Sequence, residues 1–211
     1  MNCYLIRKAR GFFSKKVFRN KVVKELRGKN ILRKATIISN NCIGCILLHD
    51  LCLRFDSPTV NLFFNSEDYI KFVENLEYYL SIPLEDVKIG DKGYPVGQLG
   101  DIQIFFQHYK SITECIEKWE SRKTRIDFDN IMLIFTDSCG MTDDLLNRFL
   151  SFPYKKIVYV SKKKWCLSDE CIYVPGFEDQ GQVPDMTSWA DWLGHRYYEK
   201  YFDIVAWLNA R

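Results

Sequence analysis

The stretch Ile131-Met-Leu-Ile-Phe-Thr-Asp137 decides the fold. Five apolar residues followed by a polar pair predict a strand that is buried on both faces. Ala35-Thr-Ile-Ile-Ser39 has the same character and ends at Asn40-Asn41. Such strands occur in sheets that helices cover on both sides, and helical patterns alternate with them along this chain. The sequence therefore predicts a Rossmann-like α/β fold with a mostly parallel sheet covered by helices.

The remaining elements follow from local patterns. Apolar, β-branched runs predict strands at Ile102–Phe106, Lys156–Val160 and Cys171–Val174. The segment from Val87 to Gly100 is rich in glycine and predicts a hairpin insertion. Apolar residues at helical spacing, with capping residues before them, predict helices. These are Ile43–Leu53, a helix capped by Ser66 that reaches Leu80, a helix opened by the capping box Ser111 and Glu114, Asp143–Leu150 capped by Thr142, and 194–208.

Charge divides the chain into two parts. Residues 1–34 hold twelve of the 30 Lys/Arg and only one acid, Glu25, so their net charge is +11. The other 18 bases and 26 acids give residues 35–211 a net charge of −8. We predict a basic amphipathic arm at 1–34, helical over 10–27, and a single α/β domain at 35–211. A cationic helix with an apolar stripe is typical of binding to an anionic membrane surface, although it could also pack on the domain.

The sequence favours a cytoplasmic protein, peripheral at the inner face of the cell membrane. No apolar run approaches the roughly 18–20 residues of a membrane span, and no apolar segment of a signal peptide follows the basic start. No nucleic-acid-binding motif is present, and the body is acidic. We therefore expect no nucleic-acid partner.

The polar loop after the first strand is the candidate substrate site. In open α/β sheets, ligands bind outside the carboxyl ends of the strands. A helix is expected to begin just after Asn41, and its free N–H groups suit an anion. The alternative is that the asparagines only form turns and caps. The residues that we predict to bind substrate in this loop are Ser39, Asn40, Asn41, His49, Ser57 and Asn61.

Two further residues are candidate catalytic bases. His108 directly follows a predicted strand, and imidazole transfers protons near neutral pH. Asp137 ends the central strand, with more polar residues close behind it. The alternatives are a structural histidine and a carboxylate that caps a helix.

Arginines and carboxylates offer sites for a diphosphate and a metal. Arg122 and Arg125 lie one helical turn apart and could bind a diphosphate, or could simply form a solvated helix face. Asp127-Phe-Asp129 matches the Asp-x-Asp pattern that holds Mg²⁺ or Mn²⁺ with a nucleotide sugar in many glycosyltransferases. It precedes a strand rather than following one, so we assign no metal ligand.

The cysteines are expected to be incidental. Cys42-x-x-Cys45 with His49, and Cys166 with Cys171, could hold zinc or form a redox pair. The spacing of the second pair is poor, and free buried cysteines commonly occupy apolar positions.

Several segments after residue 35 are similar to a bacterial family of unknown function. They include Ile38-Ser-Asn-Asn-Cys-Ile-Gly44, Ser57-Pro-Thr-Val-Asn-Leu-Phe63, His108-Tyr-Lys-Ser111 and Phe135-Thr-Asp137. Members of that family are often labelled exopolysaccharide biosynthesis proteins, and their fold is a Rossmann-like variation. The resemblance implies a role in exopolysaccharide or capsule assembly, and it leaves residues 1–34 outside.

The resemblance implies no particular reaction, and the function that we expect within this role is transfer of a glycosyl or related group. The partners would be a nucleotide-activated donor, with Mg²⁺ or Mn²⁺, and a lipid-linked glycan acceptor. Two alternatives remain open: an enzyme that modifies the glycan by acyl or phosphoryl-type transfer, and a non-catalytic scaffold subunit of the assembly complex.

Overall fold

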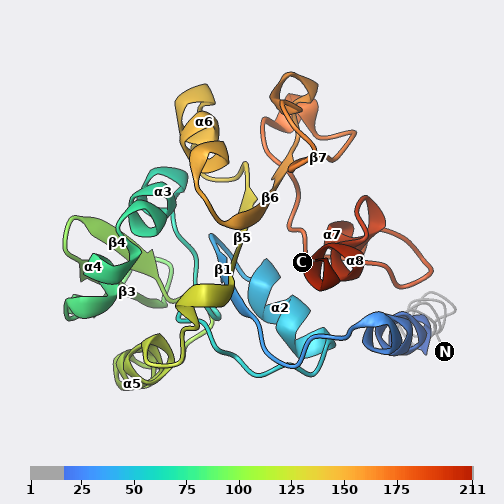
Figure 1. The fold of residues 1–211 in the computed structure, drawn as a ribbon. Coiled ribbons are helices and arrows are strands. Elements are labelled where there is room, and N and C mark those ends of the chain that lie inside the picture. Colours follow the sequence, from blue (N-terminus) through green and yellow to red (C-terminus); the bar gives the residue numbers. More distant parts are fainter. Residues whose placement is uncertain (1–16, 211) are drawn as a thin grey trace, which may run out of the picture.

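The structure, a computed structural model, describes residues 17–210. Its centre is a parallel sheet of four strands in the order β1-β5-β6-β7 (Figure 1). The strands are β1 (Thr36–Ser39), β5 (Ile131–Thr136), β6 (Lys155–Val160) and β7 (Cys171–Tyr173). The predicted parallel sheet is confirmed, with the central strand almost where its apolar run placed it.

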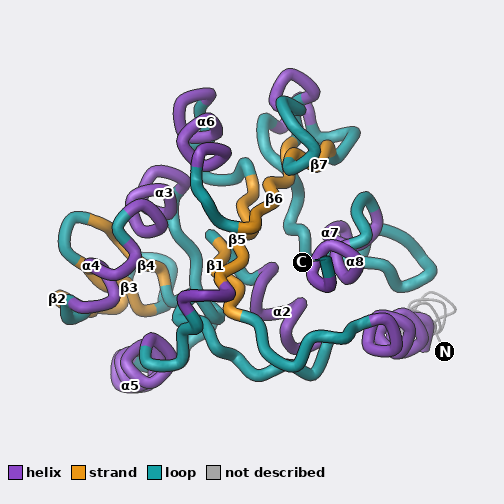
Figure 2. Tube along the Cα trace, in the orientation of Figure 1, coloured by secondary structure: helices purple, strands orange, loops and turns teal. Residues whose placement is uncertain are grey.

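Helices cover both faces of this sheet, as predicted (Figure 2). One side carries α3 (Ser66–Glu74), α4 (Leu76–Ser81), α5 (Ile112–Lys123) and α6 (Asp143–Ser151). The other side carries α2 (Ile43–Asp50), α7 (Tyr197–Lys200) and α8 (Ile204–Asn209). Short 3-10 helices lie at η1 (Phe128–Asn130), η2 (Lys163–Trp165) and η3 (Glu178–Gln180).

The six residues of β5 explain why both faces must be covered. All six are buried, and successive side chains of a strand point to opposite faces. Leu133 and Phe135 belong to the core under α3 and α6, whereas Met132 and Ile134 belong to the core under α2 and α8. The uniform apolar run is therefore the sequence of a strand between two cores.

A second, antiparallel sheet lies beside the α3 face. It contains β2 (Glu85–Ile89), β3 (Pro95–Leu99) and β4 (Ile102–Phe105), in that order. The predicted hairpin insertion is thus confirmed, and β4 extends it to three strands. Phe63 adds an antiparallel bridge to Phe105, which ties the loop after α2 to this sheet.

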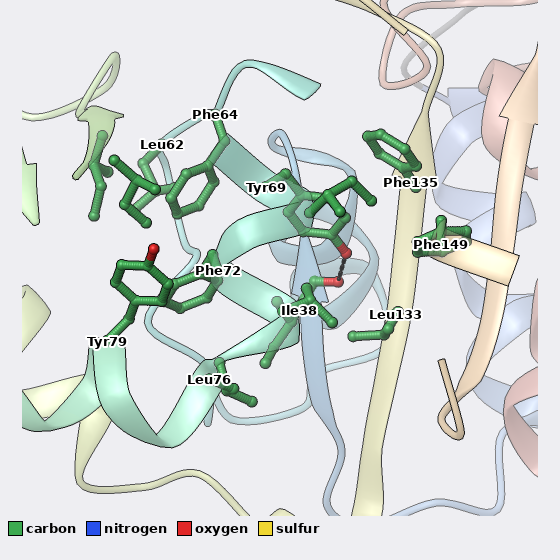
Figure 3. Packing of buried hydrophobic residues seen from close by; sticks show 14 of the residues in the cluster. Ile38, Leu62, Phe64, Tyr69, Phe72, Leu76, Tyr79, Leu133, Phe135 and Phe149 are labelled. Atoms are coloured by element: carbon green, nitrogen blue, oxygen red, sulfur yellow. Dashed lines mark hydrogen bonds between the residues drawn. The ribbon is translucent and has the colours of Figure 1, made fainter. Parts of the chain in front are cut away.

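Aromatic side chains fill the core between the two sheets (Figure 3). Tyr69 of α3 is fully buried, and its hydroxyl donates to the carbonyl oxygen of Ile38 at 2.9 Å. Its ring lies 5.0 Å from that of Phe135, which lies 5.0 Å from that of Phe149. The hydroxyl lets a tyrosine occupy a dry core position because its donor is satisfied.

The predicted helix from Ser66 to Leu80 is wrong in two details. Asn65, not Ser66, is the N-cap, and the Ser66 hydroxyl donates to the carbonyl oxygen of Ser138 at 2.7 Å. Asn75 leaves helical geometry at φ −127° and divides the segment into α3 and α4. Asparagine leaves a helix more readily than most residues because its side chain competes for backbone hydrogen bonds.

The predicted C-terminal helix over 194–208 is also broken. Gly194 has φ +86°, a left-handed conformation that suits glycine, and α7 starts only at Tyr197. Asp203 then caps α8 by accepting from the N–H of Ala206 at 3.0 Å. The sequence predicts one helix here, but Asp203 begins a second helix within the predicted range.

Residues 17–29 form a helix against the α8 side of the body (Figure 1). This agrees with the described part of the helix predicted over 10–27, and residues 10–16 lie outside the described residues. The side chain of Asn209 holds the end of this helix by donating to Lys29 O at 2.8 Å and accepting from Ile31 N at 3.1 Å. The boundary between arm and domain stays a prediction. Among residues 17–210, no helix has both the length and the apolar character to cross a membrane.

Candidate functional site

Two asparagines join the carboxyl ends of β1 and β5. The Asn40 side-chain oxygen accepts from Thr136 N at 3.1 Å, and its amide nitrogen donates to Thr136 O at 3.2 Å. The Asn41 amide donates to the Thr136 hydroxyl at 2.8 Å. Asn40 is buried and Asn41 half-buried. Both residues therefore hold the strand ends together, whatever else they bind.

The first turn of α2 is already capped by side chains. The Ser39 hydroxyl donates to Asn41 O at 2.6 Å and accepts from Gly44 N at 3.2 Å. Asn41 Oδ1 accepts from Ile43 N at 3.1 Å. The expectation of free N–H groups for an anion is therefore wrong at Ile43 and Gly44. These caps leave the helix end little capacity for a phosphate.

A pocket of about 520 Å³ opens at this edge of the parallel sheet. It falls within the volume of roughly 300–1,000 Å³ that small-molecule sites have. The structure brings three of the predicted residues together here, Asn40, Asn41 and His108. The pocket is also lined by Lys92, Tyr94, Gln107, Ser138, Gln182 and Asp185.

His108 lies at the pocket with an exposed side chain. Its backbone N–H donates to Asn61 O at 3.3 Å, which fixes the loop that follows β4. Within residues 17–210 the imidazole ring makes no hydrogen bond to another protein group. Its ring nitrogens are thus available to form hydrogen bonds with a ligand.

Asp137 is buried behind the pocket rather than lining it. Its Oδ2 accepts from both the N–H and the hydroxyl of Ser161 at 2.6 Å, and its Oδ1 accepts from Val183 N at 2.6 Å. Burial raises the pKa of Asp137 above its usual value, and the hydrogen bonds from Ser161 and Val183 oppose part of that rise. The carboxylate joins β5, the end of β6 and the loop at 176–186, and its role as a base stays a prediction.

The other predicted substrate residues of the loop lie outside the pocket. His49 is exposed at the last turn of α2, beside Asp50. Ser57 is fully buried, and its hydroxyl lies 3.0 Å from that of Thr59. Asn61, at φ +62°, accepts a hydrogen bond from the Cys45 thiol at 3.4 Å. Ser57 and Asn61 therefore shape the loop.

The two arginines of α5 are also away from the pocket. Arg122 donates to the Tyr109 hydroxyl at 2.5 Å, and its guanidinium lies 5.9 Å from the centre of the Phe55 ring. Arg125 donates to Ser121 Oγ at 2.7 Å. Neither side chain lines the pocket that contains His108, so their binding of a diphosphate stays a prediction without geometric support.

The metal candidates do not come together. Within residues 17–210, no group of three or more His, Cys, Asp or Glu side chains is placed to hold a metal ion. Asp127 precedes β5, at the opposite end of the strand from the pocket, and pairs with Lys34 at 3.3 Å.

The two cysteines at the start of α2 interact with each other. The thiol of Cys45 donates to Cys42 O at 3.1 Å. Interaction with the Cys42 thiol lowers the pKa of Cys45, whereas the Cys45 thiol and burial raise that of Cys42. Cys166 and Cys171 lie at η2 and β7.

Sequence reasoning missed the hairpin and the late loop as parts of the site. Lys92 and Tyr94 come from the tight turn between β2 and β3, and the only local signal was its glycines. Gln182 and Asp185 come from the loop after η3. Burial raises the pKa of Asp185, but hydrogen bonds from Thr187 and its neighbours outweigh this and hold the pKa below its usual value. Asp185 thus brings a carboxylate to the pocket.

Known proteins support a relationship over most of the chain. A family model described as "Domain of unknown function (DUF1919)" matches residues 13–209. An uncharacterised protein of Haemophilus influenzae is 40% identical over 174 residues, which cover 82% of this chain and 84% of that protein. The family match starts at residue 13, so it includes the helix at 17–29 that the resemblance in the sequence had left out. The expected membership of a family of unknown function is confirmed: the chain belongs to the DUF1919 family.

Proposed function

We propose that this protein transfers a glycosyl or related group from a nucleotide-activated donor during surface polysaccharide assembly. One observation carries the proposal. The imidazole of His108 makes no hydrogen bond to another group of residues 17–210. It lies in a pocket lined by amide and carboxylate side chains, at the carboxyl edge of a parallel sheet. This is the edge at which open α/β sheets bind ligands. The polysaccharide context rests on the family resemblance of the sequence.

The polar lining suits a sugar. Asn41 follows β1, whereas Gln182 and Asp185 lie on the loop after η3, and the three side chains converge on one pocket. Amide and carboxylate groups hydrogen-bond hydroxyls as donors and acceptors. Asn41 is anchored by Thr136 and Ile43, so it would contribute from a fixed position. A rigid polar wall of this kind orients a substrate before reaction.

His108 is the proposed base. It takes the proton of an acceptor hydroxyl, whose oxygen attacks the anomeric carbon of the donor sugar. The bond from that carbon to the donor diphosphate breaks, and the nucleoside diphosphate leaves with the electron pair. Charge on the leaving group needs a cation nearby, and Lys92 lines the same pocket.

The N-terminal segment would bring the body to a membrane that carries a lipid-linked acceptor. In helix 17–29 the side chains of Lys21 and Lys24 are exposed. Val17 and Trp192 are 66% and 68% exposed, and the Trp192 ring lies 6.1 Å from that of Phe18. Exposed apolar groups next to lysines suit an anionic lipid surface. If a variant without Lys21 and Lys24 still binds vesicles that contain anionic lipid, the proposed membrane contact is contradicted.

The proposal is tested by glycan production in cells that carry His108→Ala in place of the wild-type gene. We expect loss of the glycan with an unchanged melting temperature, because the ring is exposed and makes no hydrogen bond within the described part of the chain. Lys110→Ala is the matched control, since Lys110 is exposed in the same loop and does not line the pocket. Normal glycan from the His108 variant would refute the catalytic assignment.

A ligand screen separates the classes of reaction. Ligands that bind only the folded state raise the melting temperature. A shift with nucleotide sugars, with or without Mg²⁺ or Mn²⁺, supports the proposal. A shift with acyl-coenzyme A alone would instead show an acyl-transferring enzyme. Wild-type protein that responds to no donor, but is recovered with an assembly partner, would show a scaffold.

A further inference from the structure

The pocket that contains His108 continues into a second pocket under the β2–β3 hairpin. The second pocket has a volume of about 670 Å³. Four residues line both, Phe63, Lys92, Tyr94 and Cys139. The two cavities are therefore parts of one groove, polar at the sheet edge and aromatic beneath the hairpin.

Three aromatic rings line the hairpin part of the groove. The rings of Phe63 and Phe105 stack with centroids 4.5 Å apart and 7° between planes. Their backbones are joined by two hydrogen bonds, of 2.9 and 3.0 Å. Tyr94 meets Phe63 edge-on at 6.3 Å. All three are only half-buried, and none belongs to either hydrophobic core. Rigid aromatic rings that are not part of a hydrophobic core can stack against a flat ligand.

The hairpin turn brings positive charge to the junction of the two parts. Gly90 N donates to Tyr94 O at 2.9 Å, and Gly93 N donates to Gly90 O at 2.9 Å. Gly93 has φ +80°, which favours glycine, so the turn is tight. Lys92 is exposed at its tip, lines both pockets and has no ion-pair partner among residues 17–210. Lys88 adds a second exposed ammonium group to the hairpin pocket.

We propose that this groove binds a nucleoside diphosphate, with the base on Tyr94 and the phenylalanines, the diphosphate at Lys92, and the transferred group beside His108. This inference rests on the proposed function and gives it a donor-binding mode. The order of groups in a nucleotide sugar is base, diphosphate, sugar. Along the groove, Phe105 lines only the hairpin part, Phe63, Tyr94 and Lys92 line both parts, and His108 lines only the polar part. A neutral glycan would leave Lys92 without a partner, whereas bases stack on aromatic rings and phosphates pair with lysine.

Isothermal titration of the full chain tests this. The probes are UDP, GDP, ADP and TDP, and inorganic pyrophosphate as the part without a base. Saturation-transfer NMR identifies which ligand protons touch the protein. Tyr94→Ala and Lys92→Ala are compared with Tyr78→Ala and Lys118→Ala, which change exposed residues outside both pockets. His108→Ala, a change in the polar part, is the third comparison.

We expect one nucleoside diphosphate to bind more tightly than pyrophosphate. Tyr94→Ala should weaken its binding about 5- to 150-fold, because stacking of one base contributes about 1–3 kcal/mol. Tyr94→Ala should leave pyrophosphate unaffected, and Lys92→Ala should weaken both ligands. His108→Ala should not change the affinity for the nucleoside diphosphate. In the NMR experiment, saturation transfer should be strongest at the protons of the base.

The outcomes separate the two proposals. Tight nucleotide binding that neither hairpin variant weakens would overturn this binding mode and leave the nucleotide-dependent function standing. Nucleotide binding no tighter than pyrophosphate binding would overturn the stacking role. Wild-type protein that binds none of the nucleotides would overturn both this inference and the proposed donor class.

Discussion

Asp137→Asn is the substitution that best separates a structural from a catalytic carboxylate. Each carboxylate oxygen accepts from a backbone N–H, Oδ1 from Val183 and Oδ2 from Ser161, both at 2.6 Å. Asparagine has one acceptor oxygen and one NH₂ group. Either orientation of its amide places the NH₂ group against a backbone N–H. No rotamer flip can satisfy both contacts.

The expected loss follows from those contacts. A hydrogen bond to a charged acceptor contributes about 1.5–3 kcal/mol, and a buried donor left unsatisfied costs about 1–3 kcal/mol more. Asp137 is 1% exposed, so water cannot replace the lost partner. We expect the free energy of unfolding to fall by about 3 kcal/mol. For a chain of this size, that corresponds to a drop of roughly 6–12 °C in melting temperature.

The assay is thermal and urea unfolding of wild type, Asp137→Asn and Asp129→Asn. Asp129 is exposed in η1, so the same chemical change there should alter stability by under about 0.5 kcal/mol. Nucleotide binding is then measured at a temperature at which all three proteins are folded. An Asp137→Asn protein that melts like wild type but neither binds nor reacts would refute the bracing argument and make the carboxylate part of the chemistry.

Three further perturbations test the packing around the site and the N-terminal helix. Arg19→Met should lower stability by about 3–5 kcal/mol in urea unfolding, because it removes the nearest cation from the buried carboxylates of Asp50 and Glu199. Burial disfavours the charged form of Asp50, but the charges of Arg19 and Arg196 and a hydrogen bond outweigh this and lower its pKa. That stability is present above the unfolded value of about 3.9 and lost as pH falls toward the lower folded value, so the protection factors of the amides of helix 17–29 should be smaller near pH 3 than near pH 5. Gly44→Ala should lower the melting temperature, because its Cβ would lie 2.7 Å from the Ser39 oxygen.

Local patterns predicted the elements whose causes are local. The apolar run at 131–135 predicted β5 because a strand that is covered on both faces needs apolar side chains on both. Thr142 and Ser111 cap α6 and α5, as their position before an apolar periodicity indicated. Glu114 departs slightly from a capping box, because its carboxylate accepts from the N–H of Lys110 instead of Ser111.

The composition of the site depends on contacts that no local pattern reports. Asp137 follows a strand, as catalytic carboxylates often do, but its partners lie 24 and 46 residues further along the chain. Lys92 and Tyr94 reach the pocket only because the hairpin folds over the end of the parallel sheet. From the sequence alone, a glycine-rich turn gives its length and tightness but not the surface that it will face.

Polar residues at the carboxyl edge of this sheet divide into those that build the edge and those left free. Ser39, Asn40 and Asp137 have their side-chain hydrogen bonds with the protein itself. Those of Ser39 are local, to Asn41 and Gly44, whereas those of Asn40 and Asp137 join segments far apart in the chain. The groups left to meet a ligand lie on the loops around that edge, His108 after β4 and Lys92 in the hairpin turn. Functional groups are commonly carried on loops that a rigid scaffold holds in place. If this division holds, substitutions of residues that build the edge should change the melting temperature more than the ligand affinity. Substitutions of the free residues on the surrounding loops should change the ligand affinity more than the melting temperature.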